Sequence, residues 1–202
     1  MPRVSREQTD RNRLAIENAS ARLFREQGIK GVSVSDLMAA AGLTHGGFYG
    51  HFESKNGLAA VACSTAFGQS AERWQTRISG KPHREAALKA LFDGYLSPQS
   101  RNAVGSGCPM AALATDVARE PMEAPIHDAY IAGLKGLLEI LLPLQDTGDA
   151  AIDRSQALAQ LSMLVGAIVL SRASRGDALS DEFLAAASQH LAATTATQEF
   201  PQ

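Results

Sequence analysis

Two short helices on either side of a glycine-containing turn are the feature that most restricts how this chain can fold. They occupy residues 33–52, SVSDLMAAAGLTHGGFYGHF. Ser33 and Asp36 have the spacing of a capping box, with Asp in place of the usual Glu or Gln, ahead of a helix over 34–41. Gly42 ends that helix, and Thr44 can cap a second helix to about residue 52. Apolar residues in this run can lock both helices against the helix before them: Val34, Leu37, Met38, Leu43, Phe48 and Phe52.

The rest of the chain also shows helical periodicity. Apolar residues recur at helical spacing nearly everywhere, and no run alternates with period two over the length of a strand. The sequence therefore predicts an all-α fold of about nine helices. We expect them over 9–27, 34–41, 44–52, 55–79, 83–96, 109–120, 123–144, 150–174 and 180–193. Residues 97–107, SPQSRNAVGSG, combine Pro, Gly, Ser and Asn and predict an exposed, mobile loop.

Composition excludes several classes of protein. Two cysteines are too few for a disulfide framework, and five scattered histidines predict no metal centre. We find no phosphate-binding glycine loop, nucleophile elbow or HExxH pair, so we expect neither an enzyme nor a cofactor. No leader sequence precedes the first helix, which favours a reducing cytoplasm. The longest uncharged stretch, 155–171, contains three Ser and two Gln, and predicts a buried helix rather than a membrane span.

Gly46 and Gly47 break the local rules for a helix. Each should cost about 1 kcal/mol relative to Ala inside a helix, and glycine lets a backbone approach a groove wall or a phosphate closely. The alternative is that 45–47 is only a loop. Potential donors to phosphates or base edges surround the glycines: Thr44, His45, Tyr49, His51 and Lys55. The net charge is −2, but residues 1–60 hold eight Lys or Arg against six Asp or Glu, a modest basic excess.

The run over 19–58, ASARLFREQGIKGVSVSDLMAAAGLTHGGFYGHFESKNGL, resembles the N-terminal signature of the TetR (tetracycline repressor) family of regulators. The resemblance implies a helix-turn-helix that binds the major groove, with Tyr49 and Lys55 clamping phosphates. Carried over by position, it adds further residues at or near DNA: Ser33, Thr44, His45 and Gly47. The predicted DNA-binding residues also include Gly46 and His51, from the glycine pair and the donors described above. Gly47 and Gly50 depart from the commoner residues of the signature, so base preferences do not transfer. The implied division is a DNA-binding domain over 9–70 and an effector-binding and dimerisation domain over 71–195.

The resemblance is weak beyond residue 80, and what it implies there has structural alternatives. It implies that the last two helices form a four-helix dimer interface, with Leu161, Leu164, Val165, Ile168, Phe183, Leu184 and Leu191; the alternative is intramolecular core. It also implies a ligand pocket, for which the candidates are Trp74, Phe92, Tyr95, Cys108, Met110, Leu113, Val117 and Tyr130; again the alternative is core. Cys108 is placed to cap a helix, where a thiol pKa is lowered, which suits a sensor of oxidants or electrophiles. The alternative is a small residue that merely fills the cap.

Together these features predict a cytoplasmic, homodimeric repressor that binds a palindromic double-stranded DNA operator. A small molecule or an oxidant sensed in the C-terminal domain would release the DNA. The alternative function is a helical small-molecule binding protein or enzyme in which the first three helices are only structural.

Overall fold

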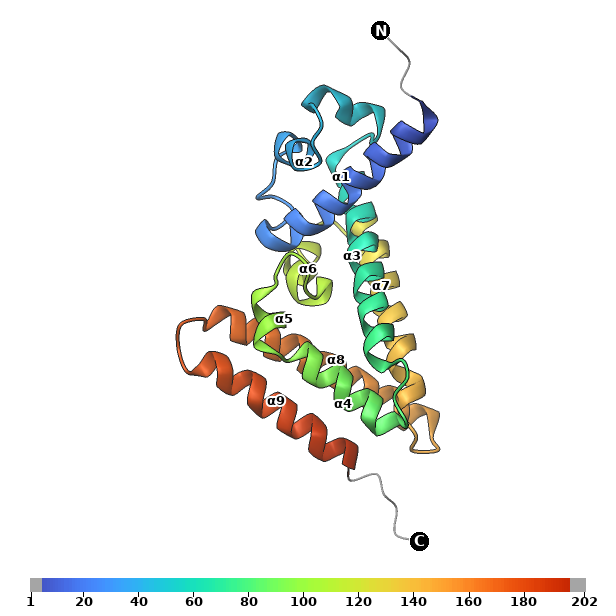
Figure 1. Ribbon diagram of the computed structural model, residues 1–202, viewed down its shortest axis with the longest axis vertical. Helices are drawn as coiled ribbons and strands as arrows, with labels where there is room; N and C mark the ends of the chain where they lie inside the picture. Colours follow the sequence, from blue (N-terminus) through green and yellow to red (C-terminus); the bar gives the residue numbers. More distant parts are fainter. Residues whose placement is uncertain (1–4, 197–202) are drawn as a thin grey trace. The chain divides into compact units, whose positions relative to one another are not determined.

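The computed structural model describes residues 5–196, and this range is helical with no strand (Figure 1). The predicted all-α class is therefore confirmed. Nine α-helices and two 3-10 helices occupy the described range: α1 (Arg6–Gln27), α2 (Val34–Ala40), η1 (His45–Gly50), α3 (Lys55–Ile78), α4 (Arg84–Tyr95), α5 (Pro98–Asn102), α6 (Pro109–Val117), α7 (Pro125–Leu141), η2 (Leu142–Leu144), α8 (Ala150–Ala173) and α9 (Leu179–Ala196).

Local capping explains where many of these helices begin and end. The Ser5 hydroxyl accepts the Gln8 N–H at the start of α1, and Gly28, at φ +76°, ends the helix. Pro109 occupies the first position of α6, where its fixed φ suits a helix and no N–H is missed. Asp149 caps α8 by accepting the N–H groups of Ala151 and Ile152. α1 ends and α6 begins at the boundaries expected from the sequence, whereas α1 begins three residues earlier than expected.

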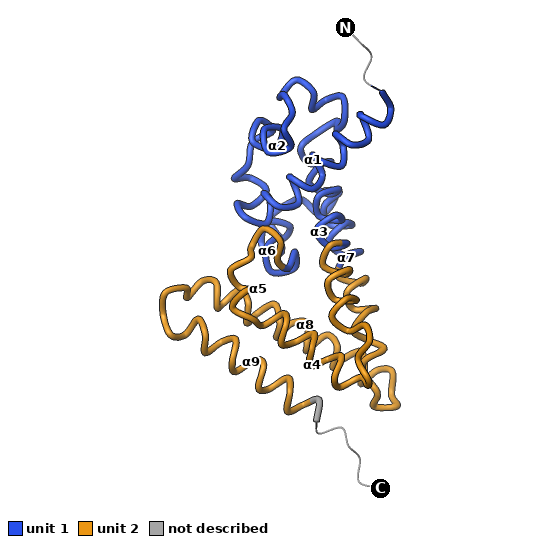
Figure 2. Tube along the Cα trace, in the orientation of Figure 1, with its two compact units in different colours: residues 1–68, 108–133 blue, residues 69–107, 134–202 orange. Residues whose placement is uncertain are grey.

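The described chain divides into two compact units, drawn in separate colours in Figure 2. Unit 1 holds the described residues through Gly68 together with Cys108–Gly133, so α6 and the first part of α7 belong with the N-terminal helices. This grouping differs from a single boundary near residue 70. Its core contains large side chains with almost no exposure: Ile16, Phe24, Leu37, Met38, Phe48 and Leu58.

Unit 2 holds Gln69–Gly107 and the described residues from Leu134 onward. Its largest helix pair is α8 and α9, packed through buried residues that include Leu164, Ile168 and Leu184. Two buried serines reinforce the pair: the Ser171 hydroxyl donates to the Ser180 carbonyl at 2.6 Å, and the Ser180 hydroxyl donates to the Ser171 carbonyl at 2.7 Å. α8 is long and apolar enough to cross a bilayer, but its inner face is used in this packing.

The segment expected as an exposed, mobile loop, 97–107, is ordered and contains α5 (Pro98–Asn102). Ser97 caps this helix by accepting the Ser100 N–H, and Pro98 stands at its first position. Arg172 of α8 donates to the carbonyl oxygens of Ser100 and Arg101 at 3.1 and 3.0 Å. The loop expectation was wrong because Ser-Pro is also a helix-starting pair, and because the contact from α8 leaves no trace in the local composition.

Candidate nucleic-acid interface

The first helix of the predicted motif is held by a complete capping box. The Ser33 hydroxyl accepts the Asp36 N–H at 3.1 Å, and the Asp36 carboxylate accepts the Ser33 N–H at 2.8 Å and the Ser33 hydroxyl at 2.6 Å. These bonds from the hydroxyl and the backbone of Ser33 hold the pKa of Asp36 below its ordinary value. Because the cap uses both donors of Ser33, this residue positions α2 and has no donor left over for a phosphate.

The turn between the two helices is built by Gly42. Its φ of +72° lies in the left-handed region, which glycine adopts at no steric cost. The Leu43 N–H then donates to the Met38 carbonyl at 2.9 Å, which closes the turn and satisfies an orphan carbonyl at the end of α2. The second element begins two residues later as a 3-10 helix, η1, rather than an α-helix.

Neither backbone conformation nor internal packing accounts for the glycines of η1. Gly46, Gly47 and Gly50 all have ordinary negative φ values. A methyl group added at Gly46 or Gly50 would meet nothing within 4 Å, and one at Gly47 would meet only the tip of Met38 at 3.5 Å. All three lie exposed on unit 1. Their absent side chains therefore leave an open backbone surface that none of residues 5–196 fills.

Donor groups surround this open backbone. Tyr49 is 71% exposed, the highest value among the large apolar or aromatic residues of unit 1 apart from Met122, and its ring stands edge-on to the buried Phe48 at 5.2 Å. Thr44 and His45 are exposed, and Nδ1 of His45 lies 3.0 Å from the Ser35 hydroxyl, a contact that orients the imidazole. Lys55 is the first residue of α3. The expected donors thus gather on one unit, around η1.

Arg13 is a residue of this site that sequence reasoning missed. From α1, its guanidinium donates to the His51 carbonyl at 2.7 Å, where η1 ends, and stacks 4.5 Å over the Phe52 ring. An ion pair with Glu17 at 3.0 Å steadies the same group. Arg13 therefore fixes the end of η1 to α1. The sequence showed only that Arg13 is one of several N-terminal arginines. A contact between residues 38 positions apart leaves no local sequence pattern.

The predicted ligand-pocket residues fall in both units and are mostly core. In unit 2, Phe92 is buried and the Trp74 ring meets Tyr95 edge-on at 6.1 Å. In unit 1, four of the candidates are buried: Cys108, Met110, Leu113 and Val117. Tyr130 is half-buried, and its hydroxyl donates to the Met110 carbonyl at 3.1 Å. Within residues 5–196, no three His, Cys, Asp or Glu side chains are grouped to hold a metal.

The two thiols lie near one phenol in unit 1. Burial, followed by the nearby thiols of Cys108 and Cys63, raises the pKa of Tyr130. Burial also raises the pKa of Cys63 to about 12, which makes it an inert thiol. Cys108 caps α6 but is only 7% exposed, so it does not stand in an open loop as its sequence context suggested.

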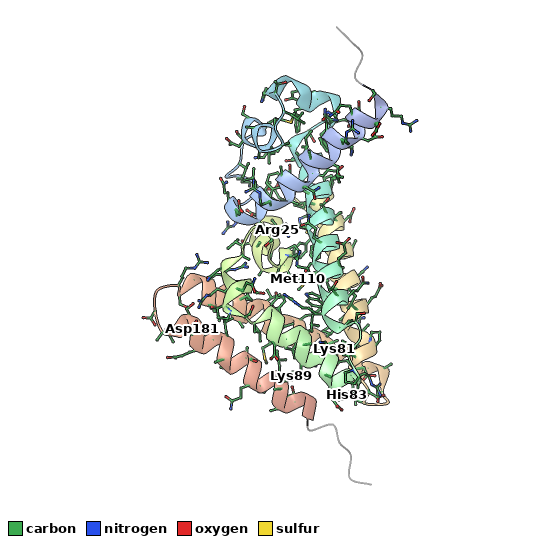
Figure 3. The ribbon with its side chains drawn as sticks, viewed as in Figure 1. Arg25, Lys81, His83, Lys89, Met110 and Asp181 are labelled. Atoms are coloured by element: carbon green, nitrogen blue, oxygen red, sulfur yellow. The ribbon has the colours of Figure 1, made fainter. Side chains whose placement is uncertain are left out.

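α6 also contacts the residues that lead into α2 within unit 1. The Asp116 carboxylate accepts the Ile29 N–H at 3.4 Å, and Lys30 pairs with Glu120 at 3.1 Å. Figure 3 marks Arg25 on α1 and Met110 on α6; both side chains are buried. The turn that leads into α2 is therefore tied to the end of α6.

Most of the predicted dimer-interface residues are buried inside the single chain. Leu161, Leu164, Ile168, Leu184 and Leu191 lie between helices of unit 2, so their burial needs no partner, while Val165 and Phe183 are half-exposed. The apolar residues that α8 leaves exposed are different ones: Ile152, Leu158, Val169 and Leu170.

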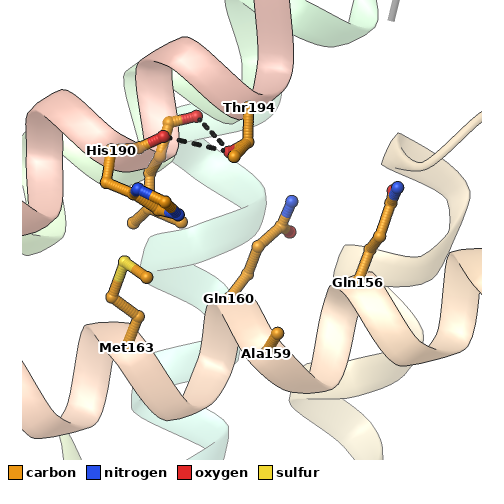
Figure 4. A pocket seen from close by; sticks show the side chains of 7 residues that line it. Gln156, Ala159, Gln160, Met163, His190 and Thr194 are labelled. Atoms are coloured by element: carbon orange, nitrogen blue, oxygen red, sulfur yellow. Dashed lines mark hydrogen bonds between the residues drawn. The ribbon is translucent and has the colours of Figure 1, made fainter. Parts of the chain in front are cut away.

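A small hollow between α8 and α9 encloses about 150 Å³ (Figure 4). Figure 4 shows Gln156, Ala159, Gln160 and Met163 facing His190 and Thr194, whose hydroxyl bonds to backbone carbonyls of α9. The Gln160 amide is already paired with Gln145 at 3.0 and 3.1 Å. The hollow is smaller than the several hundred Å³ typical of sites for drug-sized ligands.

Comparisons with known proteins agree with this geometry. Residues 16–62, which span α1 to the first third of α3, match the family model described as bacterial regulatory proteins, tetR family. The chain is 30% identical over 79 residues to the HTH-type transcriptional regulator YerO of Bacillus subtilis strain 168, a match covering 38% of this chain and 27% of that protein. It is 29% identical over 94 residues to the HTH-type transcriptional regulator AcrR of Shigella flexneri, covering 46% and 39%. These matches thus span well under half of either relative.

A solved structure extends the likeness over nearly the whole chain. The TetR transcriptional regulator from Chloroflexus aurantiacus J-10-FL is 28% identical, covers 95% of this chain and 98% of its own, and superposes with a TM-score of 0.79. The reduced form of NemR from Escherichia coli shares the fold, with a TM-score of 0.75 at 20% identity over 89% of this chain and 94% of that one.

Proposed function

We propose that this chain is a member of the TetR family of bacterial regulatory proteins, and that it is a transcriptional repressor that binds a palindromic operator as a homodimer. The open backbone of Gly46 and Gly47, with no packing reason inside the chain, is the observation that carries the DNA contact. η1 enters the major groove, with Thr44, His45 and Tyr49 toward base edges or phosphates. Lys55, at the N-terminus of α3, binds a phosphate where the helix dipole favours negative charge. The relatives are regulators, and we propose no enzymatic activity.

The second subunit supplies a second copy of the helix-turn-helix. One short helix contacts few base pairs. Two such helices related by a two-fold axis contact two half-sites separated by multiples of one turn of DNA. The outer stripe of α8 fits this interface, because Leu158, Val165 and Val169 recur at helical spacing and are exposed or half-exposed. An apolar stripe on a soluble regulator in the cytoplasm is expected to be covered by a copy of itself.

DNA binding is tested by a mobility-shift titration of the full chain against the DNA upstream of its own gene, at two or more salt concentrations. Gly46→Ala adds a methyl group that meets nothing in the protein, so the fold is preserved while the approach to DNA is blocked. We expect wild-type affinity to fall steeply with salt and Gly46→Ala to weaken binding at least tenfold. Gly68→Ala is the matched control, since its added methyl group also meets nothing.

Two further variants separate a specific contact from general charge. Lys55→Ala should reduce the slope of log affinity against log salt concentration by about one, which corresponds to the loss of one phosphate contact. Lys135→Ala, an exposed lysine of unit 2, should leave that slope unchanged. Salt-insensitive binding by the wild type, or equal shifts by Gly46→Ala and Gly68→Ala, would overturn the DNA-binding proposal.

We further propose that a small molecule or an oxidant relieves repression. α6 lies in the same unit as the motif and holds the turn before α2 through Asp116 and Glu120, so a change at α6 reaches that turn directly. For an oxidant, the target is Cys108 at the head of α6: its thiolate attacks peroxide to give a sulfenic acid, and the second peroxide oxygen leaves as hydroxide, which is protonated to water. Peroxide should then release DNA from wild type and Cys63→Ser but not from Cys108→Ser. Equal release from all three proteins would exclude Cys108 as the target of peroxide, and no release from any of them would leave a small molecule as the signal.

A further inference from the structure

Arg77 of α3 is a half-buried cation that lacks a partner in the described part of unit 2. Its guanidinium makes no hydrogen bond or ion pair with any residue from 5 to 196. Two other arginines of the unit form ion pairs: Arg84 pairs with Asp146, and Arg101 pairs with Asp181. Burial lowers the pKa of Arg77, and no carboxylate offsets that effect.

Such a residue costs the folded protein stability. A charged group taken out of water is normally paired or replaced by an apolar side chain, because desolvation is not recovered otherwise. Arg77 receives neither compensation from the residues that the structure describes. A half-buried guanidinium with free donors is therefore a group prepared for an anion that arrives from outside.

Gly94 of α4 makes the space for this guanidinium. A methyl group at Gly94 would lie 2.6 Å from Nε and 3.0 Å from Cζ of Arg77, so an alanine at this position would require the Arg77 side chain to move. Gly94 has an ordinary negative φ, so its place inside α4 has no backbone cause, although glycine in a helix costs about 1 kcal/mol relative to Ala. Gly94 therefore allows the Arg77 guanidinium to lie against α4 in its present position.

More cationic groups and two aromatic rings belong to the same neighbourhood. Arg73, one turn before Arg77 on α3, donates to the Gly107 carbonyl at 3.3 Å, and Nη2 of Arg172 approaches Gly107 as well, 2.7 Å from where a Cβ would stand. Trp74, between the two α3 arginines, contacts the ring of Tyr95, which follows Gly94. Two further arginines and a buried pair of aromatic rings therefore lie in the part of unit 2 that contains Arg77.

We propose that Arg77 anchors the carboxylate of a small organic acid in unit 2, and that an acid of this kind is the effector of the regulator. The planar guanidinium binds a carboxylate through two parallel hydrogen bonds, and one free arginine matches one negative charge better than it matches a phosphate dianion. The rings of Trp74 and Tyr95 favour an apolar body on the acid. The effector role rests on the proposed function; the binding site does not.

Trp74 supplies the assay, because it is the single tryptophan of the chain and lies one turn from Arg77. Benzoate and hexanoate are titrated into the full chain while its fluorescence is followed, with benzamide and hexanamide as neutral counterparts and inorganic phosphate as a charge control. We expect a saturable change in fluorescence with each carboxylate and little change with the corresponding amide. Arg77→Gln should bind the carboxylates at least tenfold more weakly than wild type does. Arg154→Gln, an exposed arginine of unit 2, should bind as wild type does. No response to either carboxylate, or equal binding by Arg77→Gln, overturns the site.

A ligand-free measurement gives a second test. If Arg77 is kept for a ligand, Arg77→Met should unfold at the same urea concentration as wild type or a higher one; a lower midpoint would mean a structural role and would overturn the proposal. The effector role is read from the mobility shift: the carboxylate should release DNA from wild type and from Arg154→Gln, but not from Arg77→Gln. If wild type binds no DNA, the proposed function fails while the carboxylate site stands; if DNA binds and the carboxylate does not release it, only the effector role fails.

Discussion

Two glycines of α7 allow the cost of crowding in unit 1 to be measured directly. A methyl group at Gly133 would stand 2.2, 2.3 and 2.6 Å from three ring atoms of Phe67, whereas one at Gly136, on the same helix, would meet nothing within 4 Å. Phe67 is buried and its ring contacts Tyr130 edge-on at 5.4 Å, so it cannot swing clear without losing that contact. Gly133→Ala must therefore displace a packed ring, and Gly136→Ala displaces nothing.

The expected magnitudes follow from two opposing terms. Replacing a helical glycine by alanine gains about 1 kcal/mol of helix stability at both positions. Overpacking a filled core costs about 1–3 kcal/mol, and it applies only at Gly133. Gly136→Ala should raise the free energy of unfolding by about 0.5–1 kcal/mol. The free energy of unfolding of Gly133→Ala should be lower than that of Gly136→Ala by about 1–3 kcal/mol. This difference measures the cost of crowding alone, because the gain in helix stability is the same in both variants.

Equilibrium unfolding in urea at one fixed protein concentration measures both variants, since dimerisation would otherwise shift the midpoint. Phe67→Leu shortens the obstructing side chain, so the double variant Phe67→Leu with Gly133→Ala should lose less than the sum of the single variants. Equal stability of Gly133→Ala and Gly136→Ala, within about 0.5 kcal/mol, would refute the close approach of α7 to Phe67 on which this reasoning depends.

Three further outcomes are expected. Because the pKa of Asp36 is lowered in the folded protein, its stabilising effect is full above the ordinary value of 3.8 and is lost as pH falls toward the folded pKa; urea midpoints at pH 3 and pH 6 should differ more for wild type than for Asp36→Asn. Cys63, with its pKa raised from 9.0 to about 12, should react with iodoacetamide only after unfolding, and stability should decline above about pH 9 as the unfolded thiol ionises; rapid labelling of the native thiol would contradict this. Ser180→Ala removes the hydroxyl bonded to the Ser171 carbonyl and should lower the free energy of unfolding by about 1–3 kcal/mol in urea, with an unchanged midpoint as the contrary result.

The parts of this fold that depend on neighbouring residues were readable from the sequence. Gly28 and Gly42 end helices at positive φ, Ser33 and Asp36 form the expected capping box, and Pro109 opens α6. Each is a signal completed within four residues, so no knowledge of the tertiary structure was needed. The donors around η1 could be placed for the same reason, because the motif that carries them is short.

The parts that depend on distant contacts were not readable. Arg13 holds His51 across 38 residues, and Arg172 holds the end of α5 across more than 70, without any local pattern that marks either pair. Periodicity correctly identified the apolar face of α8 but could not say what covers it. Leu161 and Leu164 face their own chain, whereas Leu158 and Val169 on the adjoining stripe face outward.

The discontinuity of unit 1 limits how this chain can be recombined with proteins of the same fold. Because Cys108–Gly133 groups with the N-terminal helices, a hybrid made by joining residues 1–68 to the remainder of another regulator would bring a foreign α6 against the native α1. The bonds from Asp116 to Ile29 and from Glu120 to Lys30 would then depend on chance agreement between the two parents. A functional chimera should exchange residues 1–68 and 108–133 together. Natural variants that differ in the residues leading into α2 should carry matching changes in α6.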